Sequence, residues 1–300
     1  MKLDLSDSQT LLKETAARLF AEKSTPAGVR EAERNSGFDP KLWQAVVSLG
    51  LVGMRAASSG ESSLLDAALV AEEAGRHLAS VPLVEGMIAA ALLERAGASM
   101  AERTTEVAIR AAEVATRAAQ VATLALKPVV ARESQLVPGG AVASLVLALD
   151  GDALVAIERA GVAAVPASSP SPVAMIDLAA ERGERIVLAS GQAAQALHAA
   201  AIEEWKLLSA ASLAGMARRA LELAGAYSCE RIQFGRPIGS FQGVAHPLAD
   251  SATDIDGAEL LIRRAIWAIA EGRGDASESI AAAWWWAGRA AERANRGMPF

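Results

Sequence analysis

The sequence is poor in cysteine, in clustered basic charge and in long apolar segments. Its 300 residues include one cysteine, Cys229, which excludes an internal disulfide framework and is typical of a reducing compartment. We expect the Cys229 thiol to be semi-buried and unreactive. The net charge is −6 and no long basic run occurs, so nucleic acid is not expected as the main partner.

The sequence also contains no segment typical of a membrane anchor. No stretch of eighteen residues is both apolar and free of charges or helix-breaking residues, so we predict no transmembrane helix and no membrane partner. The N-terminal segment MKLDLSDSQTLLKETAARLF is amphipathic and lacks the basic start and apolar run of a signal peptide. We therefore expect a cytoplasmic protein.

Small apolar side chains are abundant. Hydrophobic residues make up 52% of the chain and charged residues 21%, which is typical of globular rather than disordered proteins. Alanine dominates the composition and favours helices. A chain of 300 residues can bury a sizeable core, either in one large domain or in two to three smaller ones.

The hydrophobic spacing of residues 1–120 is helical. A serine-aspartate cap opens a first helix, and further helices are predicted from about Pro40, Leu64 and Val84. Residues 101–120 are alanine-rich with scattered arginine and glutamate, which also predicts a helix. We therefore predict an N-terminal helical domain over residues 1–120.

Residues 121–192 have the pattern of a small β module. The segment SLVLALDGDALVAIE has two apolar runs around Asp150 and Gly151, which predicts a hairpin. The segments VAAVPA and RIVLAS predict further strands. The length of the module leaves room for about four to six strands.

Residues 193–300 are predicted to be helical again. We expect one long helix at about 203–229, a second at about 242–271 and a third from near Ser277. The consecutive residues Trp284–Trp286 span about 300° around a helix, so at least one of them is predicted to face a partner subunit. The alternative is a helix that is buried on all sides. The predicted fold class is mainly α with a small β module.

The segment RIQFGRPIGSFQGVAHPLAD, residues 231–250, gathers polar and aromatic chemistry in one place. Arg231 and Arg236 can each hold a phosphate through two hydrogen bonds, and the N-terminus of the following helix favours anions. Phe234 and Phe241 offer apolar faces for a ring. The residues alone leave two interpretations open: a polar loop stabilised by glycine turns, or a site for a nucleotide pyrophosphate.

This segment resembles the flavin-contacting signature of the acyl-CoA dehydrogenase family, R-x-x-F-G-x-x-(I/L)-x-x-x-Q followed by H-x-L-A-D. The matching residues are Arg231, Phe234, Gly235, Ile238, Gln242, His246, Leu248, Ala249 and Asp250. The resemblance covers about residues 1–100 and 200–290 and is weak in between. It implies an N-terminal helical domain, a reduced central β domain and a C-terminal helical bundle that is truncated relative to the family.

The resemblance implies a flavoenzyme that binds FAD at a subunit interface. Arg231, Gln233, Phe234, Gly235 and Gln242 would hold the adenosine-diphosphate end of an FAD whose isoalloxazine lies in a neighbouring subunit. The implied reaction is α,β-dehydrogenation of an acyl-CoA thioester, in which a carboxylate removes the α-proton and the β-hydrogen leaves as hydride to the flavin. An electron-transfer flavoprotein would then accept the electrons.

Three parts of the family pattern are missing or altered. The stretch (A/C)-(L/V)-T-E-P-x-x-G-S of the middle domain has only one counterpart, LALKPVV at residues 124–130, in which Lys127 replaces the acid. The sequence ends at RANRGMPF, about where the family's Q-x-x-G-G-x-G flavin segment should begin. In many members the catalytic glutamate lies beyond that point.

No catalytic residue can be assigned with these parts absent. Some members place the base on the long helix before the arginine motif, and counting back without gaps puts that position at Trp205. The neighbouring Glu204 is the candidate base, and the alternative for Glu204 is a solvated acid at a helix start. The histidines lack partners at metal-ligand spacing, so no metal site is predicted. We expect His246 to pack near the motif.

The residues and the resemblance together favour the shorter subunit of a heteromeric acyl-CoA dehydrogenase. Heterotetramers with two copies of each of two unlike subunits are found among the steroid-degrading enzymes of actinobacteria. This chain would complete the FAD site, and a second subunit would carry the base for a steroid-derived CoA thioester. Two alternatives stay open: a self-sufficient homodimeric dehydrogenase with its base among Glu203, Glu204, Asp254 or Asp256, and a non-enzymatic helical scaffold.

Overall fold

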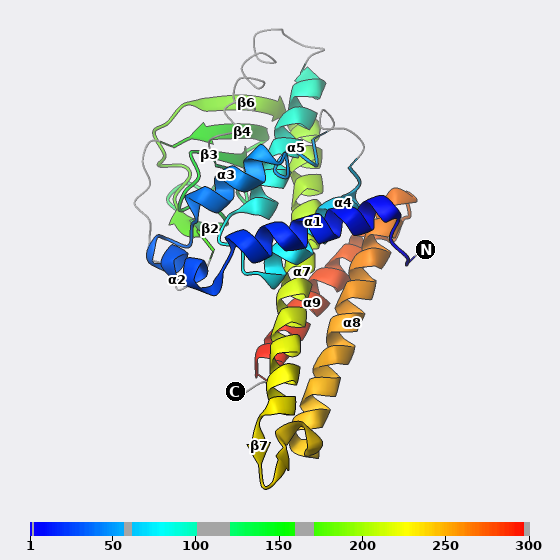
Figure 1. Ribbon diagram of the computed structural model, residues 1–300. Coiled ribbons are helices and arrows are strands. Elements are labelled where there is room, and N and C mark those ends of the chain that lie inside the picture. Colours follow the sequence, from blue (N-terminus) through cyan, green and yellow to red (C-terminus); the bar gives the residue numbers. More distant parts are fainter. Residues whose placement is uncertain (2, 57–61, 101–120, 160–170, 297–300) are drawn as a thin grey trace. The chain divides into compact units, whose positions relative to one another are not determined.

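The computed structural model describes residues 1, 3–56, 62–100, 121–159 and 171–296 (Figure 1). Along the chain, helices come first, strands follow between residues 122 and 190, and helices return from residue 191. This order confirms the predicted fold class, mainly α with a small β module. The predicted helix at 101–120 and the predicted strand VAAVPA lie outside the described residues.

The helices before the strands begin where capping residues allow it. Thr25 accepts a hydrogen bond from the backbone N–H of Gly28, and Asp39 accepts from the N–H groups of Lys41 and Leu42; a proline follows each cap. The first of these two helices was not predicted, because its nine residues bury only two side chains. The helices are α1 (Asp7–Lys23), α2 (Pro26–Arg34), α3 (Pro40–Ser48), α4 (Leu64–Arg76) and α5 (Leu83–Met100).

The β module consists of a four-stranded sheet and a two-stranded ribbon. The sheet order is β1-β3-β4-β6, in which β1 is parallel to β3 and the other pairs are antiparallel, and the ribbon pairs β2 with β5. The predicted hairpin is confirmed as β3–β4, and Gly151 in its turn has a φ of +62°. The strands are β1 (Ala122–Leu124), β2 (Gln135–Val137), β3 (Leu145–Asp150), β4 (Ala153–Glu158), β5 (Ala174–Ile176) and β6 (Arg185–Ser190).

The C-terminal helices are longer than the sequence patterns indicate. Helix α7 has 40 residues and begins at Gly191 rather than near residue 203, because the small residues after β6 contain no helix breaker. Gly272, with a φ of +59°, follows the end of α8 as predicted. The elements are α7 (Gly191–Glu230), β7 (Ile232–Gln233), β8 (Arg236–Pro237), the 3₁₀ helix η2 (Ile238–Ser240), α8 (Gln242–Ala270) and α9 (Ala276–Arg296).

The contacts divide the chain into two compact units. Unit 1 comprises Met1–Glu22, Leu64–Leu78 and Lys206–Phe300, and unit 2 comprises Lys23–Ser63 and Ala79–Trp205. These limits cut across the predicted domain limits at residues 120 and 192, which stay a prediction. In unit 2, α5 contacts β1 and β6, and the largest fully buried side chains of the sheet are Leu124, Leu147, Leu154, Ile157 and Leu188.

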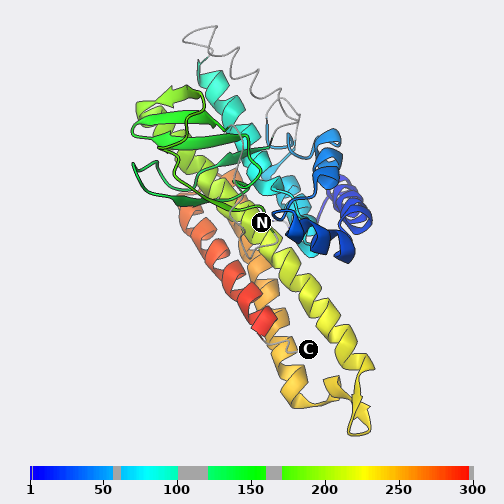
Figure 2. The same ribbon diagram turned by 90° about the vertical axis from the view of Figure 1, so that its left-hand side faces the viewer.

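Unit 1 is a helical bundle in which glycines permit close crossings. A Cβ atom added to Gly75 of α4 would overlap the carbonyl of Ser212 on α7, and one added to Gly215 of α7 would overlap the carbonyl of Glu72. Figures 1 and 2 show α7 and α8 running side by side to the β7–β8 hairpin. Within the described residues, no helix is long and apolar enough to cross a membrane.

Candidate functional site

The β7–β8 hairpin carries most of the residues that the family resemblance singles out. Gln233 pairs with Arg236, so the turn between the strands consists of Phe234 and Gly235 alone. Their φ angles are +53° and +80°, as in the type I′ turns that twist with the strands. Asparagine usually occupies the first position of such a turn, because a larger L-residue is strained there.

Phe234 is both strained and exposed. Its side chain is 92% exposed, and its one ring contact is an edge-to-face approach to Phe241 with 6.0 Å between centroids. A left-handed backbone conformation destabilises a residue of this type by about 1–2 kcal/mol. Residues with strained backbone conformations cluster at active sites and ligand-binding sites.

The two arginines of the hairpin have no carboxylate partners. Arg231 and Arg236 are exposed, and within the described part of the chain neither forms an ion pair. The Arg236 guanidinium lies over the Phe241 ring at 4.2 Å from its centroid. Two guanidinium groups without carboxylate partners at one turn would favour an anion such as a phosphate.

The N-terminus of α8 adds backbone donors beside the hairpin. Phe241 is the N-cap residue and provides no side-chain hydrogen bond, and the first turn of α8 contains no acid. The N–H groups of Gln242 and Gly243 have no partner among the described residues, and an uncapped helix start attracts anions. Gln242 itself is exposed.

Arg231, Gln233, Phe234, Gly235 and Gln242 are therefore all exposed, and they lie on or beside the β7–β8 hairpin, between the end of α7 and the start of α8. Figure 1 shows this hairpin where α7 and α8 meet. The contacts of these five residues with a cofactor remain a prediction. Gly239 of η2 has no room for a side chain, because a Cβ atom there would meet Ser228 of α7 at 2.9 Å. Its small size is therefore needed by the packing of η2 on α7.

Two other expectations near this segment were wrong. Cys229 is exposed rather than semi-buried, because it lies on the outer face of the last turn of α7. His246 is also exposed on α8, where we expected it to pack against the motif.

Glu204, the candidate base, lies in unit 2 in an ion-pair cluster. Its carboxylate is buried, and its two oxygens accept hydrogen bonds from Arg55 Nε at 2.5 Å and from Arg95 Nη2 at 3.0 Å. Because both oxygens are engaged by guanidinium groups, the geometry is that of a structural ion pair. A catalytic role of Glu204 remains an untested prediction.

A second acid with a shifted pKa, the half-buried Glu85 on α5, was missed by the sequence analysis. Burial raises the pKa of the Glu85 carboxyl, and the indole N–H of Trp205 donates to its Oε1 at 3.1 Å, which opposes that rise. A raised pKa is a property that a general base needs. The available signal was one acid in the otherwise apolar stretch LVEGMIAAALL.

Comparisons with known proteins fit this arrangement. The sequence profile "Acyl-CoA dehydrogenase, N-terminal domain" matches residues 6–104, and "Acyl-CoA dehydrogenase, C-terminal domain" matches residues 195–298. Acyl-CoA dehydrogenase IpdE2 of Mycolicibacterium smegmatis is 31% identical over 274 residues, which cover 87% of this chain and 78% of that protein. This chain belongs to the acyl-CoA dehydrogenase family.

Several solved structures with low sequence identity to this chain share its fold. PigA with FAD and proline has a TM-score of 0.79 at 19% identity, covering 99% of this chain and 88% of that chain. A variant of the Tcur3481-Tcur3483 steroid ACAD has a TM-score of 0.78 at 24% identity, covering 97% and 86%. The ChsE4-ChsE5 complex from Mycobacterium tuberculosis has a TM-score of 0.76 at 22% identity, covering 99% and 87%.

The loop after β1 is ordered but lacks the acid of the family stretch. The Gln135 side chain accepts a hydrogen bond from the Lys127 N–H and donates to the Lys127 and Pro128 carbonyls, while the Lys127 side chain is exposed. Nearby, His198 is buried against the Ala125 carbonyl at 2.9 Å. Desolvation lowers the pKa of His198, which suits a neutral structural imidazole.

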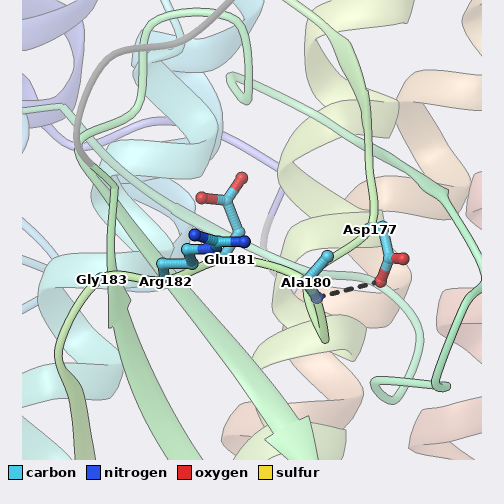
Figure 3. A pocket seen from close by; sticks show the side chains of 5 residues that line it. All are labelled: Asp177, Ala180, Glu181, Arg182 and Gly183. Carbon is cyan, nitrogen blue, oxygen red and sulfur yellow. Dashed lines mark hydrogen bonds between the residues drawn. The ribbon is translucent and has the colours of Figure 1, made fainter.

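The β module also has a surface depression of about 360 Å³ at the turn 177–183 (Figure 3). Asp177 accepts hydrogen bonds from the N–H groups of Ala179 and Ala180, and Glu181 pairs with Arg159. Asp177 therefore stabilises the turn, and Glu181 takes part in the ion pair. Among the described residues no group of three or more acids, histidines or cysteines could hold a metal ion.

Proposed function

We propose that this chain is the shorter subunit of a heteromeric, FAD-dependent acyl-CoA dehydrogenase and that it supplies part of the FAD site. The observation that carries the proposal is the β7–β8 hairpin, with an exposed, strained Phe234 beside two unpaired arginines. FAD would accept the hydride in such an enzyme. Arg231 and the free N–H groups at the start of α8 would bind its pyrophosphate, and Gln233, Phe234, Gly235 and Gln242 would contact the adenosine end.

The exposure of the hairpin supports a site shared between subunits. An FAD-binding surface that one chain completes by itself would enclose its aromatic residue. Phe234 is instead 92% exposed, and its ring touches only that of Phe241 among the described residues. A neighbouring subunit would bring the surface that covers the ring, together with the isoalloxazine pocket.

The ion-pair and loop geometry supports a division of labour in which the base lies on the partner subunit. Glu204 is engaged by Arg55 and Arg95, and Trp205 occupies the position at which some family members have the base. Lys127 stands where the family has an acid in the flavin loop. This chain would then help to bind and orient FAD, and a carboxylate of the partner subunit would remove the α-proton.

The printed names of similar proteins support a heteromer that acts on a steroid-derived CoA thioester. The ChsE4-ChsE5 structure is a complex of two named chains, and the Tcur3481-Tcur3483 structure is named a steroid ACAD. By analogy, we propose a cytoplasmic heterotetramer that contains two copies of each of two unlike subunits. An electron-transfer flavoprotein would be its electron acceptor.

The test is co-expression of this chain with an acyl-CoA dehydrogenase encoded beside it, followed by size exclusion with absorbance at the flavin band. We expect a mixed, yellow complex with stoichiometric FAD, and colourless protein when the chain is expressed alone. Yellow protein from this chain alone would overturn the half-site assignment. A colourless mixed complex would favour the scaffold alternative.

Replacing Arg231 by alanine tests the assigned contact directly. We expect Arg231→Ala to weaken FAD retention in the complex about ten- to hundredfold, the effect of one charge-assisted contact, with unchanged thermal unfolding of the chain. Arg182→Ala is the matched control, because Arg182 is also exposed and has no ion pair within the described chain. Equal FAD content in both variants would refute the role of Arg231.

Glu85 gives the self-sufficient alternative a specific candidate base. Its carboxyl is desolvated and held at one oxygen by Trp205, as a base in an apolar site would be. If this chain purified yellow alone and dehydrogenated acyl-CoA, Glu85→Gln should abolish turnover and leave FAD bound. A fully active Glu85→Gln variant would exclude this assignment.

A further inference from the structure

Two side chains that the family signature leaves open are in contact with each other at the hairpin. In R-x-x-F-G-x-x-(I/L)-x-x-x-Q, Arg236 and Phe241 both stand at x positions. The guanidinium carbon of Arg236 lies 4.2 Å from the centroid of the Phe241 ring, and the Phe234 ring meets the same ring at 6.0 Å and 83°. Phe241 is therefore the common neighbour of two hairpin side chains. We call the contact of Arg236 with this ring the Arg236–Phe241 stack.

Backbone hydrogen bonds alone hold the β7–β8 hairpin weakly. Its two strands have two residues each, and all four residues are exposed. Beyond the strands, the Ile238 N–H donates to the Arg231 carbonyl at 2.9 Å. An isolated two-stranded hairpin is marginally stable at best in water, so side-chain contacts decide how firmly this one is held.

Phe241 offers such a contact from the start of a long helix. It is the N-cap residue of α8, which has 29 residues, and its side chain is half-buried. The Arg236 guanidinium over its ring therefore links β8 to the first turn of α8. The edge-to-face approach of Phe234 adds a second link from the turn of the hairpin.

The two arginines of the hairpin differ in what surrounds them. The Arg231 side chain has no hydrogen bond, ion pair or ring contact with any described residue, so its five N–H donors are available to an anion. A turn of Arg236 toward a phosphate would instead break its contact with the Phe241 ring. The geometry therefore favours Arg231 as the anion ligand and leaves Arg236 another role.

We propose that Arg236 is a positioning residue, which holds the hairpin at the start of α8 through Phe241 and does not itself contact FAD. The inference rests on the proposed function, in which Arg231 and the N–H groups at the start of α8 bind the pyrophosphate. These donors belong to two elements, so a loosely held hairpin would have to be ordered each time FAD binds. The Arg236–Phe241 stack orders the hairpin beforehand.

The first test is a double-mutant cycle on the FAD dissociation constant of the co-expressed complex after its FAD has been removed. Arg236→Ala should raise this constant about two- to fivefold, the effect of one exposed cation–π contact. Phe241→Leu should raise it at least as much, and adding Arg236→Ala to Phe241→Leu should change nothing further, because the ring is already gone. Arg273→Ala is the control, since it removes a guanidinium from the Trp267 ring elsewhere in unit 1 and should have no effect.

Hydrogen exchange without FAD separates positioning from direct contact. In the FAD-free complex, or in the chain alone if no partner copurifies, Arg236→Ala should speed the exchange of the hairpin amides about two- to fivefold after correction for intrinsic rates. Arg236→Lys keeps a cation over the ring and should stay near wild type. Arg231→Ala should leave the exchange unchanged although it weakens FAD binding, because the Arg231 side chain touches no described residue.

Two results would each overturn the proposal. One is a further loss of FAD affinity when Arg236→Ala is added to Phe241→Leu, as a direct phosphate contact predicts. The other is unchanged hairpin exchange in Arg236→Ala. A wild-type complex that binds no FAD would instead contradict the proposed function, and the exchange would still decide whether Arg236 holds the hairpin.

Discussion

The Glu85 carboxyl has a raised pKa, which its position in an apolar helix does not predict. The side chain projects from an apolar stretch of α5, and its partner, Trp205, is 120 residues away in the sequence. Desolvation raises the pKa of Glu85, and the indole hydrogen bond opposes the rise only in part. Periodicity identifies an apolar helix here, but only the folded structure shows that its one acid is half-buried and bonded to Trp205.

Replacing Glu85 by glutamine should change how stability depends on pH. As the pH rises above the ordinary glutamate value of 4.5, the unfolded chain loses this proton while the folded chain keeps it, so stability falls until the raised pKa is passed. Glutamine has no proton to lose and can still accept from the Trp205 indole. We expect Glu85→Gln to match wild type in thermal unfolding at pH 4.5 and to exceed it at pH 8. An equal difference at both pH values would contradict this.

At the scale of helices and strands, the sequence predicted long elements well and short ones poorly. The hairpin β3–β4 and helix α8 were predicted because their apolar positions repeat over many residues. Strands β1, β2 and β5 have three residues each, too few to show an alternation. The type I′ turn at Phe234 was missed because phenylalanine is not the residue that such a turn favours.

The crossing of α4 and α7 makes a prediction about two glycines of one helix. In Gly215→Ala the new methyl group would overlap the Glu72 carbonyl, which is backbone and cannot rotate away, so the helices must separate. We expect a loss of about 1–3 kcal/mol in urea unfolding, as for other overpacked sites. Gly225→Ala is the control, since nothing lies within 4 Å of a Cβ there, and it should stabilise α7 by about 0.5–1 kcal/mol. Similar values for both variants would refute the close crossing.

At the scale of the whole molecule, the motif proposes which residues form the candidate site, which stays a prediction, but it does not reveal how exposed they are. The motif named Arg231, Phe234 and Gln242, and the structure adds that all three are exposed and that Arg231 forms no ion pair within the described chain. Exposure of a strained aromatic residue depends on what the rest of the chain fails to cover, which no local pattern records. The same holds for Trp285, whose exposure among three tryptophans is decided by the packing of α9 on α8.

Phe234 should therefore destabilise the single chain through its backbone strain and favour FAD binding in the assembled complex. In Phe234→Asn the left-handed backbone suits asparagine, so we expect the chain alone to gain about 1 kcal/mol in thermal or urea unfolding. The same change removes the aromatic surface from the proposed FAD site, so the complex should retain less FAD after size exclusion. Phe234→Tyr keeps both the strain and the ring and should change neither quantity. A Phe234→Asn complex with full FAD and a stabilised chain would show that the strained phenylalanine does not serve cofactor binding.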